Sequence, residues 1–152
     1  MILTLFTLFG GLKTTTTNLS PEFIKAREDF AAWYDSKPQE IQELIDEISD
    51  RTYFIIDEDE YDEFIEELDS LNITNASTFE DAFYAEIEYT GDSVTASFAE
   101  DLVDQGGYLM GSDMPDFIKN HIDYQSVWDC ELRFDFIQLE FNGNTYFFHN
   151  NY

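Results

Sequence analysis

Nineteen acidic residues and no lysine or arginine lie between Thr52 and Lys119, a window of nearly half the chain. A run of like charge is typical of a solvated face or a disordered segment. Apolar residues nevertheless recur inside the window at helical spacing, for example at Tyr61, Phe64 and Leu68. The window therefore predicts ordered helices, each with one buried apolar face and one acidic face.

The charge excess extends over the whole chain, which has 33 acidic and 7 basic residues among 152 and a formal charge of −26 near neutral pH. Such a surface repels nucleic acid, because nucleic-acid binding needs cations that displace condensed counterions, and it also repels anionic membranes. Hydrophobic residues make up 43% of the chain and aromatic residues 17%, which argues against disorder. We therefore expect a folded protein with no direct contact to nucleic acid or membrane.

Two helices are expected before the acidic window. Ser20 has the side chain of an N-cap, and Pro21 suits the first helical position, where the missing N–H needs no partner. Pro38 predicts the start of the second helix, whose apolar residues, including Leu44 and Ile48, follow the i, i+3, i+4, i+7 pattern. The other face of that helix is predicted to carry Glu40, Glu43, Asp46, Glu47 and Asp50.

The first part of the window predicts a strand and two helices. Residues 52–56 are aromatic and β-branched, which is typical of a short strand. The apolar spacing predicts a helix over residues 60–71. Ser77 and Glu80 have the spacing of a capping box at the start of a second helix, which would turn Phe83 inward.

The rest of the chain predicts two helical regions and a hairpin. Ser93 suits the N-cap of a helix that would end at Gly106-Gly107. Pro115 predicts a helical region that continues to Leu132, and Asn142-Gly143 predicts the turn of a terminal β-hairpin. The inward side chains of the region from Pro115 are expected to be Phe117, Ile118, Ile122, Val127 and Trp128.

The order of these elements predicts an α+β fold with several short helices and small sheets or hairpins, in one domain or two to three small ones. Residues 1–75 would form the N-terminal α/β part, and residues 76–152 a helical region with a terminal β-hairpin. The apolar opening, Met1 to Phe9, lacks a basic region and is too short to span a bilayer, so it predicts a buried strand. The single cysteine, Cys130, fits a reducing cytosol.

An ordered array of carboxylates has the charge pattern of a nucleic-acid backbone. Double-stranded DNA carries one negative charge per ~1.7 Å of axis, so −26 along one face would match on the order of 44 Å of duplex, roughly 13 base pairs. Acids at i, i+3 and i+4 of a helix lie about 5–6 Å apart, which suits arginine and lysine side chains built to hold phosphates. We therefore interpret the acids as a surface that competes with DNA for a basic groove.

An ordered set of segments in the second half of the chain resembles the ArdA-type antirestriction family. The set comprises Phe79 to Tyr84, a helix from Ser93 that leads to Gly-Tyr-Leu at residues 107–109, Met114-Pro115 leading to Ile122-Asp123-Tyr124-Gln125, and the aromatic ending Tyr146 to Tyr152. A weaker similarity extends back through residues 53–57, whereas the first forty or so residues match the family poorly.

The resemblance implies an elongated, commonly dimeric protein of phages and mobile elements that is built of small α/β modules and acts in the cytoplasm of a bacterial host. Its implied activity is to mimic DNA and occupy the DNA-binding groove of a type I restriction–modification enzyme. A mimic of another target, such as a CRISPR effector, a nucleoid protein or a transcription factor, is an alternative. The phosphate-mimicking residues are expected to be Glu43, Glu47, Asp50, Asp57, Asp59, Glu60, Glu63, Glu66, Glu67, Asp69, Glu80, Glu86, Glu88, Asp92, Glu100, Asp101 and Asp104.

The sequence predicts no dedicated metal site. The stretch that begins at Asp57 superficially resembles a calcium loop, which needs an oxygen ligand at position 5, glycine at position 6 and a bidentate glutamate at position 12. Those positions hold Tyr61, Asp62 and Leu68. Loose binding of divalent cations, as in a low-affinity calcium buffer, stays open.

Nor does the sequence predict an enzyme or a cofactor. His121, His149 and Cys130 lack the spacing of a metal-ligand set and match no nucleophile motif. The glycine pairs read as strand and helix ends rather than as a phosphate-binding loop. A small halophilic enzyme would also be acidic and poor in lysine, and it is the alternative from another class. High salt would stabilise such an enzyme, whereas it would weaken the complex of a mimic.

Overall fold

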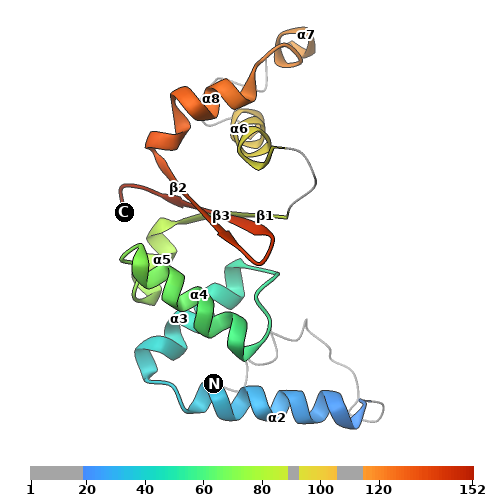
Figure 1. The fold of residues 1–152 in the computed structure, drawn as a ribbon, viewed down its shortest axis with the longest axis vertical. Helices are drawn as coiled ribbons and strands as arrows, with labels where there is room; N and C mark the ends of the chain where they lie inside the picture. The colour runs from blue at the N-terminus through green and yellow to red at the C-terminus, as the bar shows by residue number, and fades with distance from the viewer. Residues whose placement is uncertain (1–18, 89–92, 106–114) are drawn as a thin grey trace. The chain divides into compact units, whose positions relative to one another are not determined.

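The computed structural model describes residues 19–88, 93–105 and 115–152. Within these ranges the chain forms seven α-helices, one short 3-10 helix and a three-stranded sheet, so the predicted α+β class is confirmed (Figure 1). The chain divides into two compact units, Met1–Asp81 (unit 1) and Ala82–Tyr152 (unit 2). The strand predicted over residues 1–9 and the glycine pair at residues 106–107 lie outside the described residues.

Unit 1 begins with two helices that start where the sequence predicts. In α2 (Pro21–Asp35), the Ser20 hydroxyl accepts a hydrogen bond from the backbone N–H of Phe23 at 3.2 Å. Pro38 occupies the N-cap position of α3 (Gln39–Arg51). The apolar stripe of α3, which comprises Leu44, Ile45 and Ile48, is fully buried.

The acidic segment after α3 forms helix α4 (Glu58–Ser70), which begins two residues earlier than predicted. The cause is Asp57, because its side chain accepts from the backbone N–H of Glu60 at 2.9 Å. The Glu60 carboxylate in turn accepts from the N–H groups of Ile56 and Asp57, at 2.9 and 3.4 Å, which completes a capping box. The opposite face of α4 carries three fully buried side chains, Tyr61, Phe64 and Leu68.

The strand predicted over residues 52–56 is wrong, because the segment is the loop between α3 and α4. Helix α3 extends to Arg51, and Thr52 ends it by donating its hydroxyl to the Ile48 carbonyl at 2.7 Å. The residues of the loop do not alternate between buried and exposed as a half-buried strand would. Thr52 and Ile55 are buried, while Tyr53 and Ile56 point to solvent.

The capping box predicted at Ser77 and Glu80 is also wrong. Helix α5 (Ala76–Ala82) begins one residue before Ser77, and the Asn75 side chain accepts from the backbone N–H of Thr78 at 2.9 Å. The helix stops at Ala82, and Phe83 opens strand β1 (Phe83–Glu88) instead of continuing the inward helical face. Strand β1 was not predicted; its formation depends on pairing with a strand some sixty residues later.

Unit 2 contains an antiparallel sheet with the strand order β1-β3-β2, in which β2 (Phe136–Phe141) and β3 (Asn144–His149) form the predicted hairpin. Asn142 and Gly143 have φ values of 49° and 81°, the positive values that a type I′ turn requires. Strand β3 is central, and its residues 145–148 are all buried, so both faces of β3 are covered.

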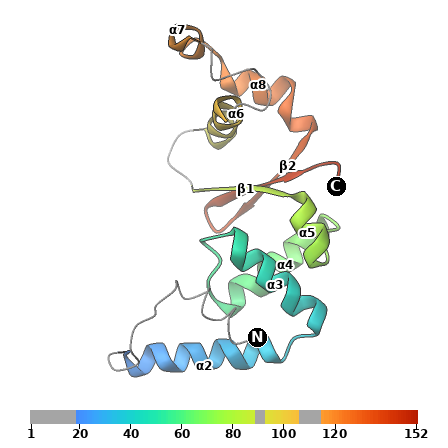
Figure 2. The ribbon, with the colours of Figure 1, turned by 180° about the vertical axis from the view of Figure 1, so that it is seen from behind.

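Helices α6 (Val94–Asp104) and α8 (Tyr124–Cys130) lie together on one face of this sheet in both ribbon views (Figures 1 and 2). Ser93 caps α6, as predicted, because its hydroxyl accepts from the N–H of Ala96 at 3.4 Å. The core between helices and sheet is aromatic. The Phe98 ring stacks on Phe147 at 4.0 Å between centroids and meets Trp128 edge-on at 5.8 Å.

The helical region predicted from Pro115 to Leu132 is not continuous. It consists of α7 (Asp116–Lys119), α8 and a 3-10 turn over Leu132–Phe134. Asp123 starts α8, because its carboxylate accepts from both the N–H and the hydroxyl of Ser126. Two residues predicted to point inward, Phe117 and Ile118, are exposed at 70% and 44%.

Candidate acidic interaction surface

The densest row of outward acids lies on α4. The helix turns Tyr61, Phe64 and Leu68 into the core, so the residues half a turn away face solvent. These are Asp59, Glu63, Glu66 and Glu67, all of which are exposed. In their spacing of i, i+4, i+7 and i+8, residues three or four positions apart have Cβ atoms about 5–6 Å from each other along the helix.

Helix α3 carries a second row on the side opposite its buried residues. Glu43, Glu47 and Asp50 follow one another at i, i+4 and i+7. Glu43 and Asp50 are exposed, whereas Glu47 is half-buried and accepts from Arg51 at 3.0 Å. Gln39 donates to Glu43 at 3.0 Å and holds that side chain on the helix surface.

In unit 2 the acids lie on α6 and β1. Glu100, Asp101 and Asp104 are exposed on α6, opposite the buried Phe98 and Leu102. On β1, Glu88 is exposed and Glu86 is half-buried, while Asp92 lies outside the described residues. The structure therefore assembles the predicted residues as separate rows, one group in each unit, with every described member at least partly exposed.

Several of the predicted residues have a partner inside their own unit. Asp57 and Glu60 form the capping box of α4. Arg51 lies within 3.0 Å of Glu47 and 3.4 Å of Glu80, and thus joins α3 to α5. In unit 2, Lys119 lies 3.4 Å from Asp104. These acids have a structural role, so the outward row of α4, together with Glu43 and Asp50 on α3 and Glu100-Asp101 on α6, contains the stronger candidates for binding.

Two acids have inward positions that the sequence does not reveal. Asp46, predicted on the outer face of α3, is half-buried and accepts from the Tyr34 hydroxyl at 3.0–3.1 Å. Burial raises the pKa of the Asp46 carboxyl above its ordinary value, and burial with the neighbouring carboxylate raises the pKa of Tyr34 to about 12. Asp62 accepts from the Trp33 indole at 3.1 Å and from Lys37 at 2.6 Å. The spacing of residues along one helix does not predict these contacts, because Asp46 and Asp62 each bind a residue outside their own helix.

Acids also occupy helix ends where stability favours bases. Asp69 lies near the end of α4, Asp104 is the last residue of α6, and Asp35 is the last residue of α2. The last turn of each of these three helices holds no basic residue. A negative charge at the carboxyl end of a helix opposes the helix dipole, by about 0.3–1 kcal/mol at an exposed site. For Asp35 and Asp69 the placement therefore does not stabilise the helix, whereas Asp104 has Lys119 as a partner.

The excess of acids is shared by both units. Unit 1 has 20 acidic and 5 basic residues, a net charge of −15, and unit 2 has 13 acidic and 2 basic residues, a net charge of −11. Charges of one sign on a small domain create a potential that attracts a basic partner and repels nucleic acid. The acidity is thus a property of the whole surface rather than of one acidic tail.

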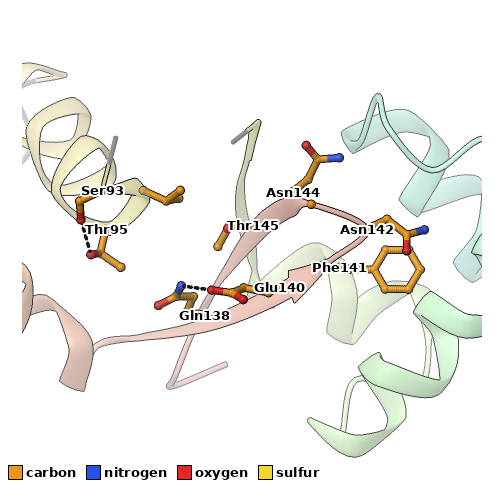
Figure 3. A pocket seen from close by; sticks show the side chains of 10 residues that line it. Ser93, Thr95, Gln138, Glu140, Phe141, Asn142, Asn144 and Thr145 are labelled. Carbon is orange, nitrogen blue, oxygen red and sulfur yellow. Dashed lines mark hydrogen bonds between the residues drawn. The ribbon is translucent and has the colours of Figure 1, made fainter. Parts of the chain in front are cut away.

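A pocket of about 500 Å³ in unit 2 lies between the start of α6 and the β2–β3 hairpin (Figure 3). Ser93 and Thr95 line it from the helix, and Gln138 and Glu140 line it from β2. The Gln138 amide donates to Glu140 at 3.4 Å. Glu140 is the one ionisable residue among the described lining residues, so the pocket offers no acid–base pair.

Searching residues 19–88, 93–105 and 115–152 for three or more His, Cys, Asp or Glu side chains arranged to hold a metal ion finds no such group. In the same ranges, no helix combines the length and the apolar character needed to cross a membrane. Comparison of the chain with protein-family models, curated proteins and solved structures gives no match. A functional interpretation therefore depends on the residues and their geometry.

Proposed function

We propose that this chain inhibits a type I restriction–modification enzyme by mimicking duplex DNA in the enzyme's DNA-binding groove. The observation that carries the proposal is the outer face of α4, where Asp59, Glu63, Glu66 and Glu67 repeat at one-turn spacing opposite a fully buried apolar stripe. Carboxylates at this spacing can meet arginine and lysine side chains that otherwise hold successive phosphates. The protein would act without catalysis, by excluding DNA from the groove.

The loss of folding stability caused by these acids supports a binding role. Glu66, Glu67 and Asp69 near the end of α4 oppose the helix dipole, and a net charge of −15 on unit 1 alone adds self-repulsion. Solubility needs a net charge of only about 2–8 on a small domain. A charge this far above that need is explained if a basic partner neutralises it in the complex.

The choice of partner follows from the resemblance of residues 79–152 to ArdA-type antirestriction proteins. A groove that binds DNA is lined by cations, and opposite potentials steer two proteins into fast association. In such a complex the rows on α3 and α4 would replace phosphates, and the acids of α6 in unit 2 would make contacts of their own. The interaction energy would be spread over many weak contacts.

The direct test is a competition assay with a purified type I restriction complex bound to a fluorescent DNA duplex. The protein should displace the duplex at low salt and do so less effectively at high salt, because salt screens the exposed charges. Retention of the duplex at a large excess of protein in low salt would exclude this target. Displacement of unrelated DNA-binding proteins with equal potency would instead indicate a mimic with a broader target range.

Charge-neutral variants with a matched control locate the surface. A quadruple variant of α4, with Asp59→Asn, Glu63→Gln, Glu66→Gln and Glu67→Gln, removes four charges from the proposed face. The matched control removes four exposed charges from α2, by Glu22→Gln, Glu28→Gln, Asp29→Asn and Asp35→Asn.

At about 0.2–1 kcal/mol per exposed ion pair, the α4 variant should compete about 4-fold to several hundred-fold less well. The α2 control should stay within a few-fold of the wild type. Equal losses in both variants would mean that total charge, rather than the α4 face, drives binding. A collapse caused by Asp59→Asn alone would contradict the idea of many small contacts.

A further inference from the structure

An apolar segment lies exposed in the middle of the acids of unit 1. The loop between α3 and α4 presents Tyr53 at 86% exposure, Ile56 at 64% and Phe54 at 39%. A single exposed apolar residue is ordinary, but a contiguous apolar patch with a polar rim typically marks a contact site. Here three of four successive residues are exposed and apolar, and they come directly before the acidic segment Asp57 to Glu60.

The backbone of this loop is held at several points. Thr52 is buried and donates to the Ile48 carbonyl at 2.7 Å, and the Ile55 side chain is buried in the core with 3% exposure. The backbone N–H of Ile56 donates to the Glu60 carboxylate at 2.9 Å. Tyr53 and Ile56 therefore project from a fixed backbone, so a partner that binds them does not first have to order the loop.

The acidic residues on both sides of the loop indicate what kind of partner can bind it. Asp50 and Arg51 precede it, and Asp57, Glu58 and Asp59 follow it directly. A second copy of this chain would bring its own acids against these, which like-charge repulsion opposes. A partner that covers the loop must instead combine cations at the rim with an apolar depression at the centre.

We propose that Tyr53 and Ile56 form an apolar anchor that inserts into an apolar depression within the basic DNA-binding groove of the target protein. The inference rests on the proposed function and adds to it the part of the interface that salt does not screen. Carboxylates that pair with a basic groove supply attraction and orientation, whereas binding energy in protein interfaces concentrates in a few desolvated aromatic and apolar residues. Along the chain, the exposed aromatic ring of Tyr53 and the exposed branched chain of Ile56 lie between the acidic rows of α3 and α4.

The test repeats the competition assay with a Tyr53→Ala/Ile56→Ala variant over a series of salt concentrations. The matched control is Phe117→Ala/Ile118→Ala, which also removes one exposed aromatic ring and one exposed isoleucine, from α7. Both pairs are exposed, so thermal melting should show both variants folded. A Tyr53→Phe variant, which keeps the ring, should compete as the wild type does.

The anchor variant should compete at least about tenfold less well at every salt concentration, with the same dependence on salt as the wild type. The charge-neutral α4 variant should differ from it by weakening the salt dependence itself. Competition equal to the wild type, or an equal loss in the Phe117/Ile118 control, would overturn the inference while leaving the DNA-mimic proposal in place. Failure of the wild type to displace DNA would overturn both.

Sedimentation of the wild type and the anchor variant distinguishes binding to a target groove from self-association of this chain. If the loop binds a second copy of this chain, the wild type will form a concentration-dependent dimer that the Tyr53→Ala/Ile56→Ala variant loses, and the inference is then wrong. The same sedimentation behaviour in both proteins, together with weaker competition by the variant, supports the anchor.

Discussion

The two units have the same acidic exterior over different interiors. In unit 1 four helices pack together, and acids take part in the internal contacts, as in the pairs Tyr34–Asp46 and Trp33–Asp62. In unit 2 a three-stranded sheet packs against two helices through a cluster of rings, with the stacked pair Phe98–Phe147 near its centre. Because the net charge is strongly negative on both, the acidity is not a consequence of one type of core. Acidity that does not depend on the type of core is expected if the proposed binding role, rather than the fold, requires it.

The largest expected effect tests the aromatic interior. Phe98→Ala removes a ring that contacts Phe147, Trp128 and Phe136 in unit 2, and should lower the free energy of unfolding by about 3–5 kcal/mol. Hydrogen exchange should show the loss of protection mainly in β1–β3, α6 and α8. The counterpart in unit 1, Phe64→Ala, should act mainly on α3 and α4. If Phe98→Ala reduces protection in α3 and α4 more than in unit 2, the distinction between the two interiors fails.

The stability of unit 1 should depend on the Tyr34–Asp46 hydrogen bond at high pH. The folded pKa of Tyr34 is about 12 against an ordinary value of 10.0, so its contribution is fully present below pH 10 and is lost as the pH rises toward about 12. The stability lost should be less than the roughly 2–3 kcal/mol that two pKa units represent, because solvent screens the partly buried pair. Urea unfolding across this range should show a shallower decline for Tyr34→Phe than for the wild type. Parallel pH profiles would contradict the role of the Tyr34–Asp46 pair.

A smaller effect distinguishes structural acids from outward acids within one helix. Asp57→Ala removes the N-cap of α4 and should lower stability by about 1 kcal/mol. Glu63→Ala, which is exposed in the middle of the same helix, should change stability by no more than about 0.5 kcal/mol. In unit 2, Ser93→Ala removes the cap of α6 and should behave as Asp57→Ala does. Equal losses of stability for Asp57→Ala and Glu63→Ala in urea unfolding would contradict the distinction between structural and outward acids.

The smallest expected effect is a gain in stability. Replacing Glu66 and Glu67 by glutamine near the end of α4 removes charges that oppose the helix dipole, and should raise stability by about 0.3–1 kcal/mol at low salt. Glu100→Gln with Asp101→Asn should do the same on α6. Thermal melting at low and high salt measures the gain, which should fade as salt screens the charges. A loss of stability in either variant would mean that these acids support the fold.

Features that depend on neighbours along the chain were predicted well. Ser20 and Ser93 do cap helices, Pro38 does start one, and Asn142-Gly143 does form the hairpin turn. Each of these signals acts over a few residues, through a side-chain hydrogen bond or a backbone preference. The outward position of the acids on α4 followed equally from the helical period.

Errors arose where distant parts of the chain decide the outcome. The apolar run at residues 52–56 resembles a strand, but α3 extends to Arg51 and the following residues form a loop. Phe83 has helical spacing, but β1 forms there because β3 offers hydrogen bonds, with Phe83 opposite Phe148. Phe117 and Ile118 resemble core residues, yet the helix that carries them is one turn long and leaves them exposed.

The sequence alone determined the sign and size of the charge, the α+β class, and the helical period that turns most acids outward, because these depend on composition and local spacing. Only the tertiary structure decided which acids are structural, since Asp46 and Asp62 find partners on a different helix. It also decided that Tyr53 and Ile56 are exposed on a fixed loop rather than paired in a strand. Contacts of that kind depend on how the folded chain brings its helices together, which no short stretch of sequence contains.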